Sequence, residues 1–223
     1  RRVGPVTFPR ARDLGPLLAG WLLALGVLVF QRDLGSALLF FGMFMAMLYI
    51  ATSRASWILL GLGLIAFGAA LAFLFMPHVT ARFEIWLRAF DPEIYHRDFG
   101  GSYQVVQGLF AMASGGLMGT GPGEGRIKNV LPDAHADFVF AVMGEEFGMI
   151  VCALLIAVFM FIVVRGMLRL LAETDLFVIL AATGLLTQFG LQAFINMGST
   201  LHLIPTKGMT LPFVSYGGSS SLA

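Results

Sequence analysis

The sequence predicts an all-α polytopic membrane protein, a bundle of transmembrane helices with one large extracytoplasmic loop. Hydrophobic residues make up 58% of its 223 residues and charged residues only 12%, against roughly 45–50% and about 25% in a soluble domain. Five apolar runs are also long enough to cross about 30 Å of hydrocarbon, which takes roughly 17–25 helical residues. Half the usual charge cannot cover a surface in water, so the bilayer is the predicted solvent.

The five apolar runs define the expected membrane helices. Inside lipid every backbone amide must be paired within its own segment or in a closed barrel, so long unalternating runs indicate helices. The runs are residues 14–30, 34–51, 57–76, 147–164 and 176–195. A sixth run begins near Phe213 and stops at Ala223, and the chain starts without Met, so both ends are expected to be cuts.

Charge bias predicts how these helices cross the membrane. Connections on one side carry seven arginines, whereas the short connections on the other hold only Arg32 and Lys207. The Arg-rich side is expected to be cytoplasmic. The chain then divides into three parts: 1–76 with three helices, 77–137 as the extracytoplasmic loop, and 138–223 with two helices, a re-entrant-like outward loop and the start of a last helix.

The outer loop is long enough to expect a function for it. Residues 81–90 alternate charged and apolar side chains at helical spacing, which indicates an interfacial amphipathic helix. Residues 103–113 predict a second short helix, and six glycines between Gly115 and Gly125 predict turns. Pro132 is expected to open the next helix at its first position.

Several classes of protein are disfavoured by composition. The single Cys152 excludes an internal disulfide and a multi-cysteine metal site, and the four histidines lack metal-ligand spacing. A net charge of +1 gives no reason to expect a nucleic-acid partner. No cofactor and no metal ligand is identifiable, and a need for a divalent metal stays open.

The first candidate site lies where the outer loop becomes a membrane helix. The string LPDAHADFVF at 131–140 and the GEEFG that follows place Asp133, His135, Asp137, Glu145 and Glu146 there. Ionisable groups at the mouth of a bundle are functional candidates because burying them is costly. The alternative is that Asp133 complements a helix N-terminus and the others are solvated. A helix from Pro132 would put Glu145 about 12 Å beyond Asp137, too far for a close dyad.

The second candidate site is the outward segment NMGSTLHLIPTKGMTLPFVSYGG at 196–218. Lys207 is a lone cation between two prolines, in a segment rich in small and hydroxylic residues that includes Ser215. Lysine can bind a pyrophosphate as a point charge. Lys207 could instead extend its charge to lipid headgroups.

A third cluster consists of basic residues in the outer loop, which would suit an anionic lipid substrate. Long loops cross the membrane largely regardless of charge, so these residues could also have no such role. The cluster comprises Arg82, Arg88, Arg97, Arg126 and Lys128.

Four strings resemble the SEDS family, which includes FtsW, RodA and SpoVE. They are QRDLG at 31–35, YQVVQ at 103–107, LPDAHADFVFAVMGEEFG at 131–148 and LIPTKGMTLPFVSYGGSS at 203–220. The TKG and TLP elements resemble the FtsW branch more than the RodA branch. The sequence departs from the family pattern at Arg32, usually Pro, and at Ala136, usually Thr. The resemblance implies a fold of ten membrane helices, of which this chain matches helices five to ten.

The resemblance also implies an activity: an inverting peptidoglycan glycosyltransferase that polymerises lipid II at the outer face of the bacterial inner membrane. Asp137 matches the family's essential aspartate and is the expected general base. Lys207 and Arg82 are expected to stabilise the departing undecaprenyl pyrophosphate, and His135, Glu145 and Ser215 are further substrate-binding candidates. The implied partners are a class B penicillin-binding protein and divisome membrane proteins at the septum.

Three alternatives stay open at this point: a RodA-type elongation polymerase, a lipid II flippase and a scaffold. A flippase would need ionisable groups deep in the bilayer, and the five runs hold no charged residue at mid-depth. The sequence therefore favours an enzyme over a transporter.

Overall fold

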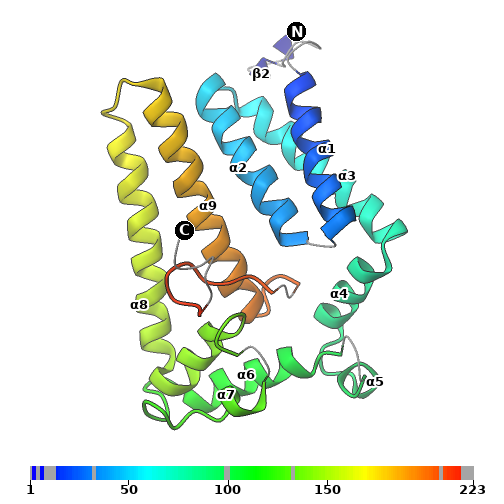
Figure 1. Ribbon diagram of the computed structural model, residues 1–223, viewed down its shortest axis with the longest axis vertical. Helices are drawn as coiled ribbons and strands as arrows, with labels where there is room; N and C mark the ends of the chain where they lie inside the picture. The colour runs from blue at the N-terminus through cyan, green and yellow to red at the C-terminus, as the bar shows by residue number, and fades with distance from the viewer. Residues whose placement is uncertain are drawn as a thin grey trace. The chain divides into compact units, whose positions relative to one another are not determined.

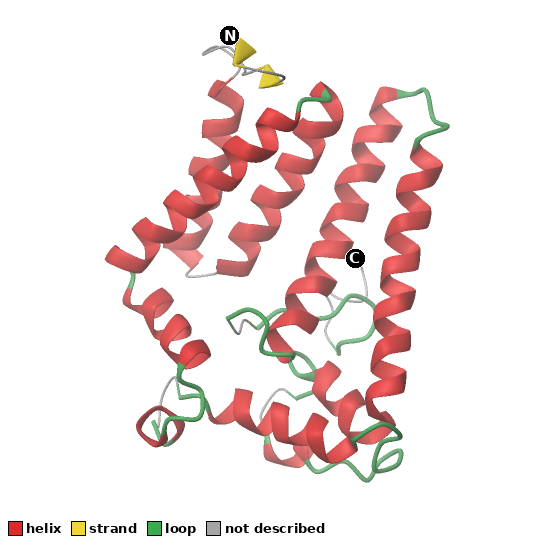
Figure 2. Cartoon of the chain, turned by 180° about the vertical axis from the view of Figure 1, so that it is seen from behind, coloured by secondary structure: helices red, strands yellow, loops and turns green. Residues whose placement is uncertain are grey.

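The computed structural model describes residues 2–3, 6–7, 14–31, 34–97, 101–131, 134–205 and 208–216. The all-α prediction is confirmed, since helices dominate these ranges (Figures 1 and 2). Beside the helices stands one antiparallel pair of two-residue strands, β1 (Arg2–Val3) and β2 (Val6–Thr7).

Among the described residues, four helices are long and apolar enough to cross a membrane: α2, α3, α8 and α9. α1 contains a shorter apolar stretch, Leu18–Val27. The helices are α1 (Leu14–Gln31), α2 (Leu34–Thr52), α3 (Ala55–Phe75), α4 (Pro77–Leu87), α5 (Pro92–Tyr95), α6 (Tyr103–Gly115), α7 (Ile127–Val130), α8 (Val139–Leu170) and α9 (Leu176–Thr200).

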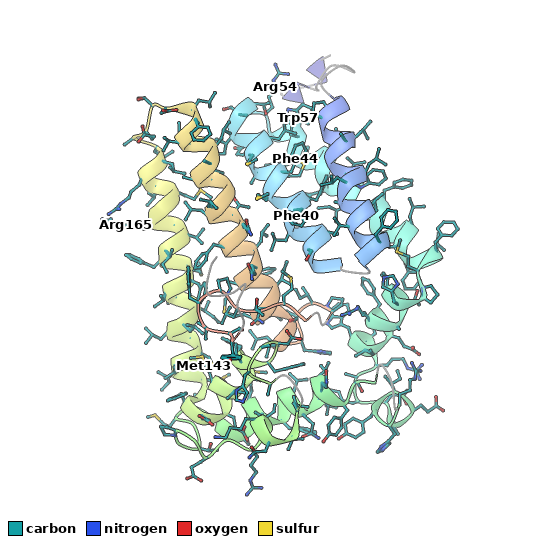
Figure 3. All side chains as sticks on the ribbon, viewed as in Figure 1. Phe40, Phe44, Arg54, Trp57, Met143 and Arg165 are labelled. Atoms are coloured by element: carbon teal, nitrogen blue, oxygen red, sulfur yellow. The ribbon has the colours of Figure 1, made fainter. Side chains whose placement is uncertain are left out.

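The chain forms two compact units. The first, Arg1–Thr80 with Val163–Leu191, contains α1, α2 and α3. Phe40 and Phe44 project from α2 and the buried Trp57 from the first turn of α3 (Figure 3). Small residues allow helices in lipid to approach closely. Gly20 of α1 is such a position, because an added Cβ there would lie 2.9 Å from the Phe44 ring of α2.

The second unit, Ala81–Ile162 with Gln192–Ala223, contains the candidate site. α6 packs on the start of α8 around the buried Ala111 and Ala141. α4, α5 and α6 share a smaller apolar cluster of Ile85, Ile94 and Val105. Apolar contacts between helices thus hold together the described residues of this unit, which include no strand.

Two predicted boundaries are wrong, and one predicted run is part of a longer helix. The amphipathic helix is α4, which begins at Pro77 and ends at Leu87 rather than covering 81–90. The next helix does not open near Pro132, because residues 134–137 form turns and α8 begins at Val139. The run predicted at 147–164 lies within α8, most of it after the interruption at Gly148. The turns of α8 before Gly148 contain Glu145 and Glu146, whose charges lower the local hydropathy.

Two predictions fall partly or wholly outside the described residues. The sixth membrane run would begin near Phe213, but residues 213–216 form turns and residues 217–223 are not described. Arg32 and Asp33, in the connection between α1 and α2, also lie outside the described residues.

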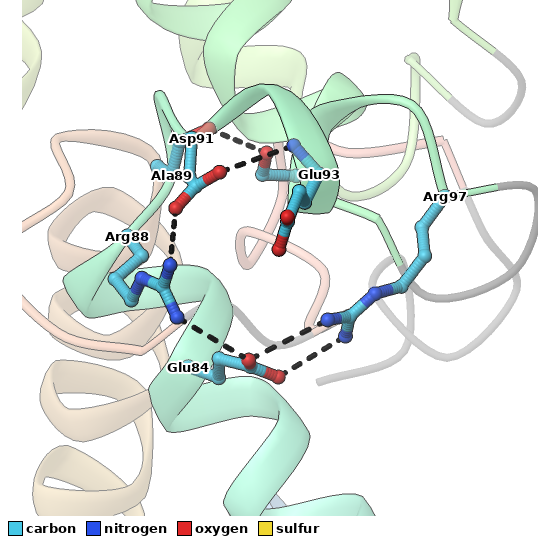
Figure 4. Close-up of polar contacts among 7 residues, drawn as sticks. Glu84, Arg88, Ala89, Asp91, Glu93 and Arg97 are labelled. Atoms are coloured by element: carbon cyan, nitrogen blue, oxygen red, sulfur yellow. Dashed lines mark hydrogen bonds and ion pairs between the residues drawn. The ribbon is translucent and has the colours of Figure 1, made fainter.

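The outer loop is tied together by ion pairs (Figure 4). Arg97 donates to Glu84 at 3.1 Å, and Arg88 pairs with both Glu84 and Asp91. Asp91 also caps α5 by accepting from the backbone N–H of Glu93 at 3.1 Å. Hydrogen bonding from Arg97 lowers the pKa of Glu84, and the bond from Glu93 N–H, with that from Arg88, lowers the pKa of Asp91. Two of the loop's predicted basic residues are thus matched by carboxylates.

Candidate functional site

The candidate site is built on a non-helical stretch just before α8. A stretch without helical hydrogen bonds leaves its carbonyl groups in need of donors. Three consecutive carbonyls receive donors from distant parts of the chain. The bonds run from Tyr216 N to His135 O (3.1 Å), from Ser215 Oγ to Ala136 O (2.7 Å) and from Asn196 Nδ2 to Asp137 O (3.2 Å).

Asn196 holds two irregular segments together. It is completely buried near the end of α9, and its side-chain amide donates to Met209 O as well as to Asp137 O. Gln192, one helical turn earlier, donates to Thr210 O at 3.0 Å. Because residues four apart share a face of a helix, one stripe of α9 fixes residues 208–210 next to the start of α8.

The carboxylate of Asp137 lies against the backbone of Gly208. A Cβ added to Gly208 would come within 2.6 Å of Asp137 Oδ2, closer than real Cβ atoms approach. The side chain of Asp137 is only partly buried. The absence of a side chain at position 208 therefore leaves room for this carboxylate.

Arg82, on α4, interacts electrostatically with Asp137. Partial burial lowers the pKa of the Arg82 guanidinium, and the charge of Asp137 opposes that shift by raising it. The site thus combines a partly exposed carboxylate with a partly buried cation.

Ser215 connects residues 211–215 to the stretch before α8. Its hydroxyl donates to Ala136 O and accepts from Leu211 N–H at 2.7 Å. The side chain is only 5% exposed, and the adjoining Leu211 and Pro212 are completely or almost completely buried. The structure therefore gives Ser215 a bridging position between two backbone segments.

The chain matches a family model described as "Cell cycle protein", that of FtsW, RodA and SpoVE, over residues 2–223. The chain belongs to the FtsW/RodA/SpoVE family. The resemblance to the SEDS family is thereby confirmed.

Curated members of the FtsW/RodA/SpoVE family show how much of such a protein is present. The chain is 43% identical over 218 residues to "Peptidoglycan glycosyltransferase RodA" of Mycobacterium leprae (strain TN), which covers 98% of this chain and 46% of the relative. It is 41% identical over 204 residues to "Probable peptidoglycan glycosyltransferase FtsW" of Caulobacter vibrioides, covering 91% of this chain and 50% of the relative. The chain spans about half the length of these curated relatives, and both branches occur at similar identity.

A solved structure agrees with this assignment. It comes from the work entitled "Structural coordination of polymerization and crosslinking by a peptidoglycan synthase complex". The TM-score is 0.69 at 27% sequence identity, over 96% of this chain and 58% of the solved one. The helical fold of this family member is thus shared with part of a chain solved in that work.

The two glutamates of GEEFG bind the glycine-rich loop. Each oxygen of Glu145 accepts a backbone N–H at 3.0 Å, from Arg126 and from Ile127 at the start of α7. Both glutamates are buried, at 5% and 9% exposure. Glu145 is thus a carboxylate whose two oxygens are already occupied by backbone amides.

Glu146 also binds the glycine-rich loop and the lysine that follows it. Its carboxylate accepts from Gly123 N–H at 3.0 Å and from Lys128 Nζ at 2.8 Å. The backbone carbonyls of Glu145 and Glu146 accept from Thr120 and Gly121. These two carbonyls have no donor within the helix, because Gly148, at φ +80°, interrupts α8.

The predicted site residues are only partly brought together. Asp137, Arg82 and Ser215 belong to one neighbourhood, and His135 contributes its carbonyl while its side chain is exposed. Lys207 lies outside the described residues, as does Asp133. Among the described residues, no group of three or more His, Cys, Asp or Glu could hold a metal ion.

Sequence reasoning missed Asn196, Gln192 and Gly208. The available signal was two amide side chains four residues apart at the C-terminal end of an apolar run, followed by a TKG motif. A polar amide inside a membrane helix needs a partner, and here the partners are the irregular segments around Asp137.

Proposed function

We propose that the full-length protein is a peptidoglycan glycosyltransferase that polymerises lipid II, with Asp137 as its general base. The observation that carries the proposal is the position of this carboxylate. It is partly exposed at the start of a membrane helix, on a backbone held by buried donors, with Arg82 nearby. Two relatives from different branches that are named peptidoglycan glycosyltransferases support the same activity.

In the proposed reaction, Asp137 removes the proton from the acceptor sugar hydroxyl of lipid II. The hydroxyl oxygen then forms a bond to the anomeric carbon of the growing glycan, and undecaprenyl pyrophosphate leaves with inversion. Positioned proton transfer of this kind contributes about 10²- to 10⁴-fold. Asp137 keeps its geometry because Asn196 and Ser215 bind the backbone on which it sits.

The leaving pyrophosphate needs its own charge stabilisation. Arg82 is the described cation that interacts with Asp137, so it is proposed to face the pyrophosphate beside the reacting centre. Lys207 is proposed to supply a second positive charge, as its motif implies. Two cations would match a pyrophosphate better than a single one.

The test is lipid II polymerisation by the purified full-length protein, read as glycan strands on a gel. Wild type should make glycan, and Asp137→Ala should make essentially none while inserting normally and keeping the wild-type melting temperature. Normal glycan synthesis by Asp137→Ala would refute the assignment of the base. A flippase or a scaffold would make no glycan even as wild type.

We further propose a class B penicillin-binding protein as partner, in the inner membrane. The similar solved structure, whose title names a peptidoglycan synthase complex, supports this kind of assembly. The TKG and TLP elements favour a septal, FtsW-type role with divisome proteins, whereas 43% identity to a mycobacterial RodA favours elongation. Depletion in the native cell separates them, because losing a septal enzyme gives filaments and losing an elongation enzyme gives round cells.

A further inference from the structure

An apolar cavity of about 620 Å³ lies in the second unit, away from the contacts of Asp137 described above. Its walls come mainly from α6 and α8, with Leu117 from the glycine-rich loop and Leu201 just after α9. Its volume falls within the range of about 300–1,000 Å³ that is usual for ligand pockets.

The chemistry of the wall selects the class of occupant. All twelve lining residues are aliphatic, Phe, Met, Gly, Ala or Cys, so the wall offers no charged or hydroxyl side chain. A water molecule needs two to four polar partners, and apolar cavities of this kind stay dry or bind apolar molecules. A polar sugar or a pyrophosphate would lose its hydration there without compensation. A wall of this composition favours a hydrocarbon as occupant.

The interruption of α8 at Gly148 indicates the depth of the cavity in the membrane. After Gly148 the helix continues for 22 residues, 149–170, which at 1.5 Å per residue span about 33 Å, close to the hydrocarbon thickness of a bilayer. Met149 and Ile150, the first residues of this part, line the cavity. The cavity therefore lies on both sides of the interruption, with Phe140 and Gly144 before it and residues from Met149 to Ile156 after it, in the part of α8 that matches the hydrocarbon layer in length.

The cavity is continuous with an exposed apolar surface of α8. Met149 and Ile150 are 56% and 54% exposed, and Leu117, which also lines the cavity, is 68% exposed. The loop lies against the helix there, because the N–H groups of Met149 and Ile150, free at the helix interruption, donate to Gly116 O and Leu117 O. The lining thus leads from an exposed apolar rim into the protein.

We infer that this cavity binds one hydrocarbon chain of a membrane lipid from the outer leaflet. The chain can belong to a phospholipid or to a polyprenyl-linked lipid, which present the same apolar surface. Binding there would pack the glycine-rich loop against α8 and so support the loop that Glu145 and Glu146 hold. The inference does not depend on the glycosyltransferase activity.

Photo-crosslinking of the full-length protein tests the inference. The protein is placed in vesicles of phosphatidylethanolamine and phosphatidylglycerol that contain either a phospholipid with a diazirine in its acyl chain or a polyprenyl phosphate with a diazirine in its chain. Adducts are mapped by mass spectrometry. We expect adducts on cavity residues such as Met112, Cys152 and Ile156, and the arm that gives them identifies the kind of lipid.

Cavity-filling variants supply the matched comparison. Ala153→Trp should reduce these adducts roughly tenfold or more, because a filled pocket excludes the chain. Leu154→Trp is the control, since Leu154 is 62% exposed on the same helix and does not line the cavity. Ala113→Phe fills the cavity from α6 and should act like Ala153→Trp if that variant fails to insert.

Three results would overturn the inference. One is the absence of cavity adducts in both arms while exposed residues of α8 such as Met160 are labelled. Another is equal labelling in Ala153→Trp and Leu154→Trp. The third is crosslinking of a photoreactive residue at position 153 to another protein segment, which would show that protein fills the cavity.

Discussion

The buried amide of Asn196 donates a hydrogen bond of 3.2 Å to the backbone carbonyl of Asp137, 59 residues earlier in the chain. The same amide binds Met209 O, next to the Gly208 that lies against the Asp137 carboxylate. One side chain of α9 therefore fixes both the backbone of the proposed base and the segment that limits where its carboxylate can lie.

Asn196→Ala should lower kcat for lipid II polymerisation about 10- to 100-fold with little change in KM, because small displacements of a catalytic group can cost that much. The control is Gln192→Ala, which removes an equivalent amide bond to Thr210 O but none to Asp137. Steady-state kinetics and melting temperatures are measured for both. Equal losses of kcat in the two variants would show that Asn196 has only a general structural role.

Gly208→Ala should abolish most activity. The new methyl group would lie 2.6 Å from Asp137 Oδ2, so the carboxylate or the 208–210 backbone must shift. Gly63→Ala is the control, because no atom outside its own helix surroundings lies within 4 Å of an added Cβ there. If Gly208→Ala polymerises lipid II as fast as Gly63→Ala does, the proposed packing of the base is wrong.

Glu145→Gln should destabilise the glycine-rich loop by about 1–3 kcal/mol. Glutamine has one acceptor oxygen instead of two, so one of the buried N–H groups of Arg126 and Ile127 would be left without an acceptor. Limited proteolysis between Gly115 and Val130 should become faster than in wild type. Glu124→Gln, at an exposed position in the same loop, is the control and should leave the cleavage rate unchanged. Unchanged cleavage in Glu145→Gln would contradict the anchoring role.

The ion pairs around Glu84 and Asp91 should make the α4–α5 segment sensitive to acid. Both carboxyls have pKa values below their ordinary ones, so their stabilisation is fully present above about pH 4.5 and is lost as the pH falls through the lowered folded-state values. Hydrogen exchange in residues 84–97, corrected for intrinsic rates, should accelerate on acidification below pH 4. Glu84→Gln should show fast exchange already at neutral pH. A corrected exchange rate that does not change with pH in wild type would contradict the predicted loss of stability on acidification.

Much of the fold was predictable because it follows from local patterns. A run such as 34–51 must be a helix in lipid, since its amides have no other partners, and α2 covers Leu34–Thr52. Asp137 could be singled out because the motif around it resembles a known family. The start of α8 could not be predicted, because the carbonyls of residues 135–137 bind donors from α9 and from residues 215–216.

The sequence by itself determined the solvent, the helical class and the family of this protein, because hydrophobic length and contiguous motifs are read along the chain. Only the tertiary structure decided that Glu145 anchors a loop, that Asn196 supports Asp137 and that α6 and α8 enclose a cavity. These relationships join residues far apart in sequence. A hydrogen bond or a cavity between two segments depends on where those segments meet in the folded protein. The hydrophobic pattern within either segment does not contain that information.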